Sequence, residues 1–119
     1  MDKVREAIYQ ILLKCIYKGA YSNLALQALS REDFTRRDRA FATEAVYGAV
    51  SKKRALEHII GQHSSVPIKK MSSQVHVLLI LGAYQIIYMS KVPDSAACNT
   101  TVELAKVHSK KSVGFINAV

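Results

Sequence analysis

The longest hydrophobic run of the chain, Val75 to Met89, is apolar on every side of a helix. A helix without a polar face is buried all round in a water-soluble protein. A membrane span is the alternative, but it needs about 20 consecutive apolar residues, and this run is shorter and contains His76 and Gln85. We therefore predict a buried central helix from about Ser73 to Lys91, around which the other segments pack.

Gly82 lies in the middle of this predicted helix. A glycine in a helix costs about 1 kcal/mol relative to alanine. One interpretation is that a second helix comes close at this point, where a side chain would be in the way. The other is that the glycine is a tolerated flaw in the helix.

Hydrophobic residues elsewhere also recur at helical spacing. The first helix is predicted from about Lys3 to Lys18, with Asp2 as its cap and Gly19 as its stop. A short second helix is predicted from Ser22 to Leu29, followed by a turn at residues 31–34.

A capping box, in which Thr35 caps and Asp38 supplies the acid, opens the next predicted helix. This helix is expected to run continuously from Arg36 to about Ile60 and to end at Gly61. After the central helix, Pro93 forces a break, and a further helix starts at Asp94 or Ser95. A basic loop from Ser109 to Gly114 then leads into the first turn of a last helix. No segment shows the strict alternation of a strand, so the predicted fold class is all-α.

The 119 residues fit one domain, and the net charge is +8 with a pI near 9.7. No acidic residue lies between Glu57 and Asp94, and none follows Glu103. This imbalance indicates an anionic partner. The alternative is a lysine-rich surface that only keeps the protein in solution.

Cys15 and Cys98 both fall on apolar helix faces, which predicts two core thiols rather than a disulfide. The four histidines show no paired ligand spacing, so no metal site is expected, and we predict that they lie at the surface or at helix ends. They are His58, His63, His76 and His108. The first residues show no signal peptide pattern, and no membrane association and a cytoplasmic location are expected.

Six phrases, in order along almost the whole chain, resemble the NusB domain family. They are Arg5-Glu6-Ala7; Arg37 to Glu44 with Val46-Tyr47-Gly48; Leu78-Leu79 with Leu81-Gly82-Ala83-Tyr84-Gln85; Val92 to Ala97; Val102 to Lys106; and Gly114 to Val119. This resemblance implies a compact all-helical bundle that binds RNA, with residues 1–119 forming one NusB-like domain.

The family has two bacterial branches. One is the free-standing transcription antitermination factor, which binds boxA RNA together with ribosomal protein S10. The other is the N-terminal domain of the 16S rRNA cytosine-C5 methyltransferase. The phrases Tyr47-Gly48, Leu81 to Gln85 and Pro93 to Ala97 are more similar to the methyltransferase branch. The ending at Val119, inside a predicted helix, also favours a domain of a longer chain.

Three positions depart from the family pattern. Ile80 replaces an arginine that usually follows the paired leucines, Thr100 replaces a frequent glutamate, and Ser51 replaces a frequent basic residue. These departures affect charged contacts with RNA or a protein partner, and leave the hydrophobic pattern of the fold intact.

In the methyltransferase branch, the resemblance implies that catalysis belongs to a separate Rossmann-like domain. That domain binds S-adenosylmethionine with a Gly-rich loop and carries nucleophilic cysteines in Pro-Cys phrases. This chain has no such loop, and neither Cys15 nor Cys98 follows a proline. We therefore expect these residues to have no cofactor and no enzymatic activity of their own, and to work beside a catalytic domain.

The resemblance also assigns candidate RNA-binding residues: Lys3 and Arg5 at the start of the first helix, and Lys110, Lys111 and Phe115 before the last one. Lysine and arginine would neutralise phosphates, and an exposed aromatic ring would stack on a base. The alternatives are a solvated basic helix face and a phenylalanine in the core. A different function class also stays open, a protein-interaction module that binds S10 or forms a dimer through its apolar faces.

Overall fold

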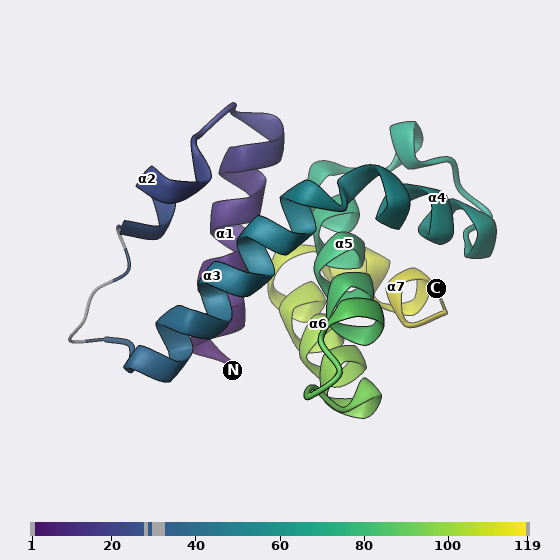
Figure 1. Ribbon diagram of the computed structural model, residues 1–119. Coiled ribbons are helices and arrows are strands. Elements are labelled where there is room, and N and C mark those ends of the chain that lie inside the picture. Colours follow the sequence, from purple (N-terminus) through teal and green to yellow (C-terminus); the bar gives the residue numbers. More distant parts are fainter. Residues whose placement is uncertain (1, 28, 30–32, 119) are drawn as a thin grey trace.

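The computed structural model describes residues 2–27, 29 and 33–118, and their side chains except those of residues 113, 117 and 118. Over these residues every regular element is helical, which confirms the predicted all-α class (Figure 1). The elements in chain order are α1 (Lys3–Tyr17), α2 (Ser22–Gln27), α3 (Arg36–Ser51), α4 (Lys53–His63), the 3₁₀ helix η1 (Ile68–Lys70), α5 (Ser73–Tyr88), α6 (Asp94–His108), the 3₁₀ helix η2 (Lys110–Ser112) and α7 (Val113–Ala118).

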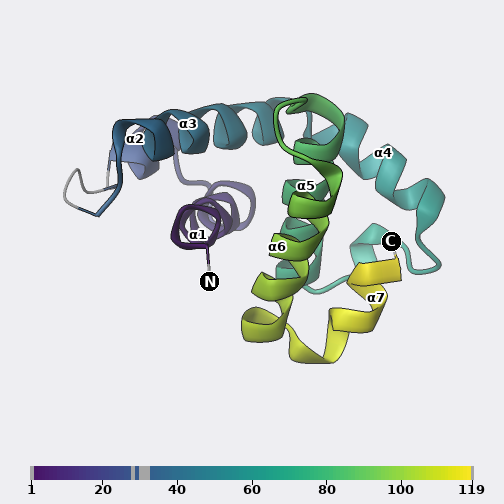
Figure 2. The same ribbon diagram turned by 90° about the horizontal axis from the view of Figure 1, so that it is seen from below.

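Helix α5 is the centre of the bundle, as the hydrophobic pattern predicts. Helices α1, α3, α4 and α6 all pack against it, and Figure 2 shows α6 running alongside α5. Residues 75–82 are all buried, as are Tyr84 and Gln85. The prediction of burial all round fails only in the last turn, where Ile86, Ile87 and Tyr88 are exposed. None of the helices described is long and apolar enough to cross a membrane.

Gly82 marks a close approach between helices, as one of its two interpretations proposed. A Cβ atom placed on Gly82 would lie 2.9 Å from Oγ1 of Thr101, a buried residue of α6. The glycine therefore lets a side chain of α6 pack directly on the backbone of α5.

The predicted caps are present. The Asp2 carboxylate accepts a hydrogen bond from the backbone N–H of Arg5 at the start of α1. Thr35 and Asp38 form the full capping box of α3. Gly19, with φ of +68°, follows the end of α1 in the left-handed conformation that glycine adopts at little cost. The predicted end of the second helix at Leu29 and the turn at residues 31–34 involve residues 28, 31 and 32, which lie outside the described residues.

The predicted continuous helix from Arg36 to Ile60 is wrong. Lys52, with φ of −98° and ψ of 12°, separates α3 from α4, although its N–H still bonds the Gly48 carbonyl at 2.9 Å. After this break the chain continues as α4, which packs against α5. Leu56 and Ile60 of α4 are buried there in the hydrophobic core. Helix α4 also passes through Gly61 and ends only at His63.

Two further predictions need correction. Cys98 is exposed and Cys15 is only half-buried, so the pair of core thiols is wrong for Cys98. Helix α6 buries Ala97, Thr101, Leu104 and Ala105, and Cys98 lies about 100° round the helix from Ala97. The predicted basic loop from Ser109 to Gly114 contains η2 and the start of α7.

Candidate nucleic-acid interface

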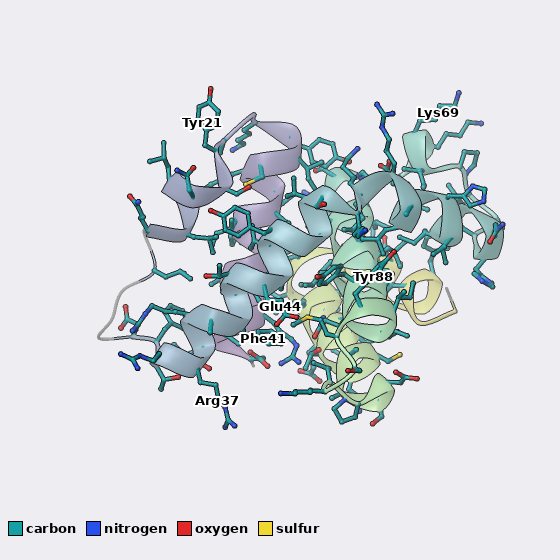
Figure 3. The ribbon with its side chains drawn as sticks, in the orientation of Figure 1. Tyr21, Arg37, Phe41, Glu44, Lys69 and Tyr88 are labelled. Carbon is teal, nitrogen blue, oxygen red and sulfur yellow. The ribbon has the colours of Figure 1, made fainter. Side chains whose placement is uncertain are left out.

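Lys3 is exposed on the first turn of α1. Its ammonium lies 5.9 Å from the centroid of the Phe34 ring, in the segment that leads into α3. Arg36 and Arg37, the first two residues of α3, are also exposed. Lys3 therefore lies close to the start of α3. Figure 3 shows the Arg37 side chain projecting away from the bundle at this end of α3. These two arginines are not among the predicted RNA-binding residues, because their only signal in the sequence is a basic pair directly after Thr35.

Arg5 is held inside the molecule rather than offered to solvent. Its Nε donates a hydrogen bond of 2.6 Å to Oε1 of Gln85 in α5, and its guanidinium also bonds the Asp2 carboxylate at 2.5 Å. The guanidinium carbon lies 4.9 Å from the centroid of the Phe41 ring. Arg5 thus joins α1 to α3 and α5, and its hydrogen bonds favour a structural role over a phosphate contact.

Lys110 and Lys111 are exposed in η2, directly after the end of α6. That end is attached to α1, because Nε2 of His108 lies 2.5 Å from Oε1 of Glu6. The His108 ring also packs on Tyr9, with ring centroids 4.4 Å apart. The structure therefore places the two lysines next to a segment that is fixed on the first half of α1.

Phe115 of α7 is half-buried and packs against the hydrophobic core. Its ring contributes to the packing of α7, as the core interpretation expected. It is thus a weaker candidate for base stacking than a ring that stands free on the surface.

A second polar cluster lies at the other end of α1, where Tyr17, Glu57 and His76 meet. His76, the fourth residue of α5, is buried, so of its two predicted placements, the surface or a helix end, the surface is wrong. Its Nε2 lies 2.7 Å from the Glu57 carboxylate, and its Nδ1 bonds the Tyr17 hydroxyl. A neutral imidazole with its proton on Nε2 satisfies both partners, since it donates to Glu57 and accepts from Tyr17.

The surroundings of His76 favour this neutral form. Burial lowers the pKa of His76 below its usual 6.5, and outweighs Glu57, which acts in the opposite direction. Burial also raises the pKa of Tyr17. The cluster ties α1, α4 and α5 together and is distant in sequence from the basic residues above. Within the described residues, no three His, Cys, Asp or Glu side chains are grouped so that they would hold a metal ion.

The NusB family model matches residues 2–119. The chain belongs to the NusB family. The resemblance drawn from the six sequence phrases is thereby confirmed, and the all-helical fold agrees with it.

Two similar proteins are named as probable ribosomal RNA small subunit methyltransferase B. The one from Synechocystis is 36% identical over 117 residues, and the one from Bacillus subtilis is 35% identical over 118 residues. Each match covers 98% of this chain but 26% of the relative. The chain thus spans about a quarter of the length of these methyltransferases. The transcription antitermination protein NusB of Ruminiclostridium cellulolyticum is 30% identical over 120 residues, which cover 99% of this chain and 81% of that protein.

Proposed function

We propose that this domain binds ribosomal RNA as the accessory module of a 16S rRNA cytosine-C5 methyltransferase. The observation that carries the proposal is the match of 98% of the chain to about a quarter of two proteins named as rRNA methyltransferases, at higher identity than the antitermination protein reaches. The domain holds the RNA, and the catalytic chemistry belongs to a separate domain with its own S-adenosylmethionine. The cytoplasm, where ribosomal RNA is made in bacteria, is the proposed location.

The charge distribution supports RNA as the ligand. Lys3, Lys110 and Lys111 are exposed, and in the described part of the chain none of them is in an ion pair. The acids at the start of α1 already have partners, because Asp2 bonds Arg5 and Glu6 bonds His108. The lysines are therefore available to neutralise phosphates.

The experiment compares two matched pairs of lysines, each in a 3₁₀ helix. A Lys110→Glu, Lys111→Glu variant is titrated with a hairpin fragment of 16S rRNA at several salt concentrations, beside a Lys69→Glu, Lys70→Glu control in η1. We expect the first variant to lose most of its affinity and to show a salt slope lower by roughly 0.7 to 0.9 per contact removed. Equal losses in the two variants would mean that RNA is attracted only by diffuse charge.

The second candidate function is that of a free-standing antitermination factor, favoured by the match that covers 81% of the Ruminiclostridium protein. Such a factor would bind boxA RNA together with ribosomal protein S10. Binding assays with boxA RNA, with and without S10, separate the two functions, because only the antitermination factor should gain affinity for boxA when S10 is added. The length of the parent open reading frame is an independent test.

A further inference from the structure

Helices α3 and α5 cross at a notch formed by Gly48. The ring of Tyr84 fills the notch so closely that a Cβ atom on Gly48 would lie 1.8 Å from the Tyr84 hydroxyl. Tyr84 is only 7% exposed. Its ring is therefore fixed in position by the crossing of the two helices.

Tyr88, one turn further along α5, stacks on this fixed ring. The two ring centroids are 5.3 Å apart and the ring planes differ by 26°. Tyr88 is 39% exposed, and the Lys52 ammonium, from the junction of α3 and α4, lies 5.8 Å from its centroid. The result is a supported, partly exposed aromatic ring beside a positive charge; Tyr88 is labelled in Figure 3.

Lys52 lies over the Tyr88 ring, and two further basic residues are near in sequence: Arg54, two residues after Lys52, and Lys91, three residues after Tyr88. Lys52, Arg54 and Lys91 are exposed, and none of the ion pairs in the described ranges includes them. The neighbouring Lys53 is neutralised by Glu57 at 3.2 Å. One acid acts on this ring pair: burial raises the pKa of Tyr84, and Glu44, one turn before Gly48 on α3, and Tyr88 raise it further.

We propose that Tyr88 is the stacking platform of an RNA subsite that is separate from Lys110 and Lys111. An unpaired base lies on the part of the Tyr88 ring that Tyr84 does not cover, and the Lys52 ammonium, on its flexible side chain, binds an adjoining phosphate. Stacking on a tyrosine suits any base, because every base has a π face, and it requires single-stranded RNA. The subsite rests on the proposed RNA-binding function and extends it to loops or ends of ribosomal RNA.

The start of α1 contacts the C-terminal half of α5, the helix that carries Tyr88. Arg5 of α1 bonds Gln85, and Gln85 lies three residues before Tyr88 on the same helix. Lys3 itself lies at Phe34, before the first turn of α3, and Lys52 follows the last turn, so an RNA that uses both regions runs along the 16 residues of α3, about 24 Å. The exposed positive charges at both ends of α3 favour an RNA strand over a protein partner as the occupant of the Tyr88 surface.

The test uses an oligouridylate of about 12 nucleotides, which forms no stable duplex and falls within the usual site size of single-strand binders. Tyr88→Ala should lose about five-fold to a hundred-fold in affinity, the range that one base stacked on an aromatic ring supplies. Tyr88→Phe keeps the ring and should bind like the unaltered protein. Tyr21→Ala removes a tyrosine that is 74% exposed on another part of the surface, and it should change little.

A photo-crosslinking experiment gives an independent readout. An oligonucleotide carrying 5-iodouridine should crosslink to the peptide that contains Tyr88 on irradiation, and this peptide should be lost in Tyr88→Ala. Thermal melts of all variants check that each remains folded. If the oligonucleotide binds but Tyr88→Ala behaves like Tyr21→Ala and no crosslink reaches Tyr88, the subsite is wrong and RNA binding stands. If neither this RNA nor the rRNA hairpin binds the unaltered protein, the subsite and the proposed function both fail.

Discussion

Gly48 of α3 and Tyr84 of α5 interlock, with the tyrosine ring occupying the space in which a side chain at position 48 would stand. The contact fixes how closely α3 and α5 approach, and the exposed Tyr88 is stacked on the same ring. One glycine thus determines both a helix crossing in the core and the support of a surface residue.

Replacing Gly48 with alanine should therefore destabilise the fold. Alanine in a helix normally gains about 1 kcal/mol over glycine, but here the new methyl group overlaps a buried ring, and overpacking typically costs about 1 to 3 kcal/mol. The matched control is Gly61→Ala in α4, where nothing lies within 4 Å of the new Cβ atom, so stability should rise. Urea unfolding of both variants measures the difference, and a Gly48→Ala protein as stable as Gly61→Ala would contradict the interlock.

The sequence predicts the parts of this fold that depend on local signals. The apolar run of α5, the Asp2 cap, the Thr35 and Asp38 capping box and the stop at Gly19 each depend on neighbouring residues, and all are present. Contacts between distant segments are different. The partner of Gly48 lies 36 positions away (84 − 48 = 36), so the hydrophobic pattern alone could not reveal it.

The corrections have the same physical origin. Lys52 breaks a helix whose own spacing would continue, because α4 must turn to bury Leu56 and Ile60. His76 is buried because Glu57 and Tyr17, from two other helices, satisfy both ring nitrogens. For the candidate site, the family resemblance supplied Lys3, Arg5, Lys110, Lys111 and Phe115, while the structure shows that Arg5 and Phe115 also contribute to packing.

The buried His76 predicts a loss of stability in mild acid. Because its pKa is lowered in the folded protein, the unfolded chain binds more protons below pH 6.5, the ordinary value for histidine. The stability that His76 contributes is thus fully present above pH 6.5 and is lost as the pH falls through the lowered pKa. Melting temperatures measured from about pH 7.5 down to 5.5 should fall, and His76→Gln, which does not titrate, should reduce this dependence.

The exposed His58 provides the control for that experiment. His58→Gln removes one histidine without changing the buried cluster, so its melting temperature should follow the pH as the unaltered protein does. If His76→Gln and His58→Gln showed the same pH dependence, a neutral buried His76 would be the wrong description.

Variants of Arg5 and Lys3 should distinguish an effect on stability from an effect on RNA affinity. Arg5→Gln removes hydrogen bonds to Asp2 and Gln85 and should lower the free energy of unfolding by about 1 to 3 kcal/mol. Lys3→Gln changes an exposed residue and should cost less than about 0.5 kcal/mol, yet lower the salt slope of RNA binding. If Lys3→Gln bound RNA with unchanged affinity and salt slope, Lys3 would not be part of the RNA interface.

The last prediction concerns Glu6 and His108, whose bond of 2.5 Å fixes the end of α6 on α1 just before Lys110 and Lys111. If this contact positions the two lysines, Glu6→Ala, His108→Ala and the double variant should all weaken RNA binding by similar amounts. In unfolding experiments the pair should show a coupling of about 1 kcal/mol.

The direction of the Glu6→Ala effect is what makes this test decisive. Removing an acid near an RNA site should strengthen binding if only the net charge matters, since phosphates are repelled by carboxylates. Glu103→Ala supplies that comparison, because Glu103 is an exposed acid on α6 whose one described ion pair is with Lys106, at 3.6 Å. We expect Glu103→Ala to bind RNA as well as or better than the unaltered protein and Glu6→Ala to bind it less well. A gain in affinity for Glu6→Ala equal to that for Glu103→Ala would show that the contact with His108 does not position the lysines.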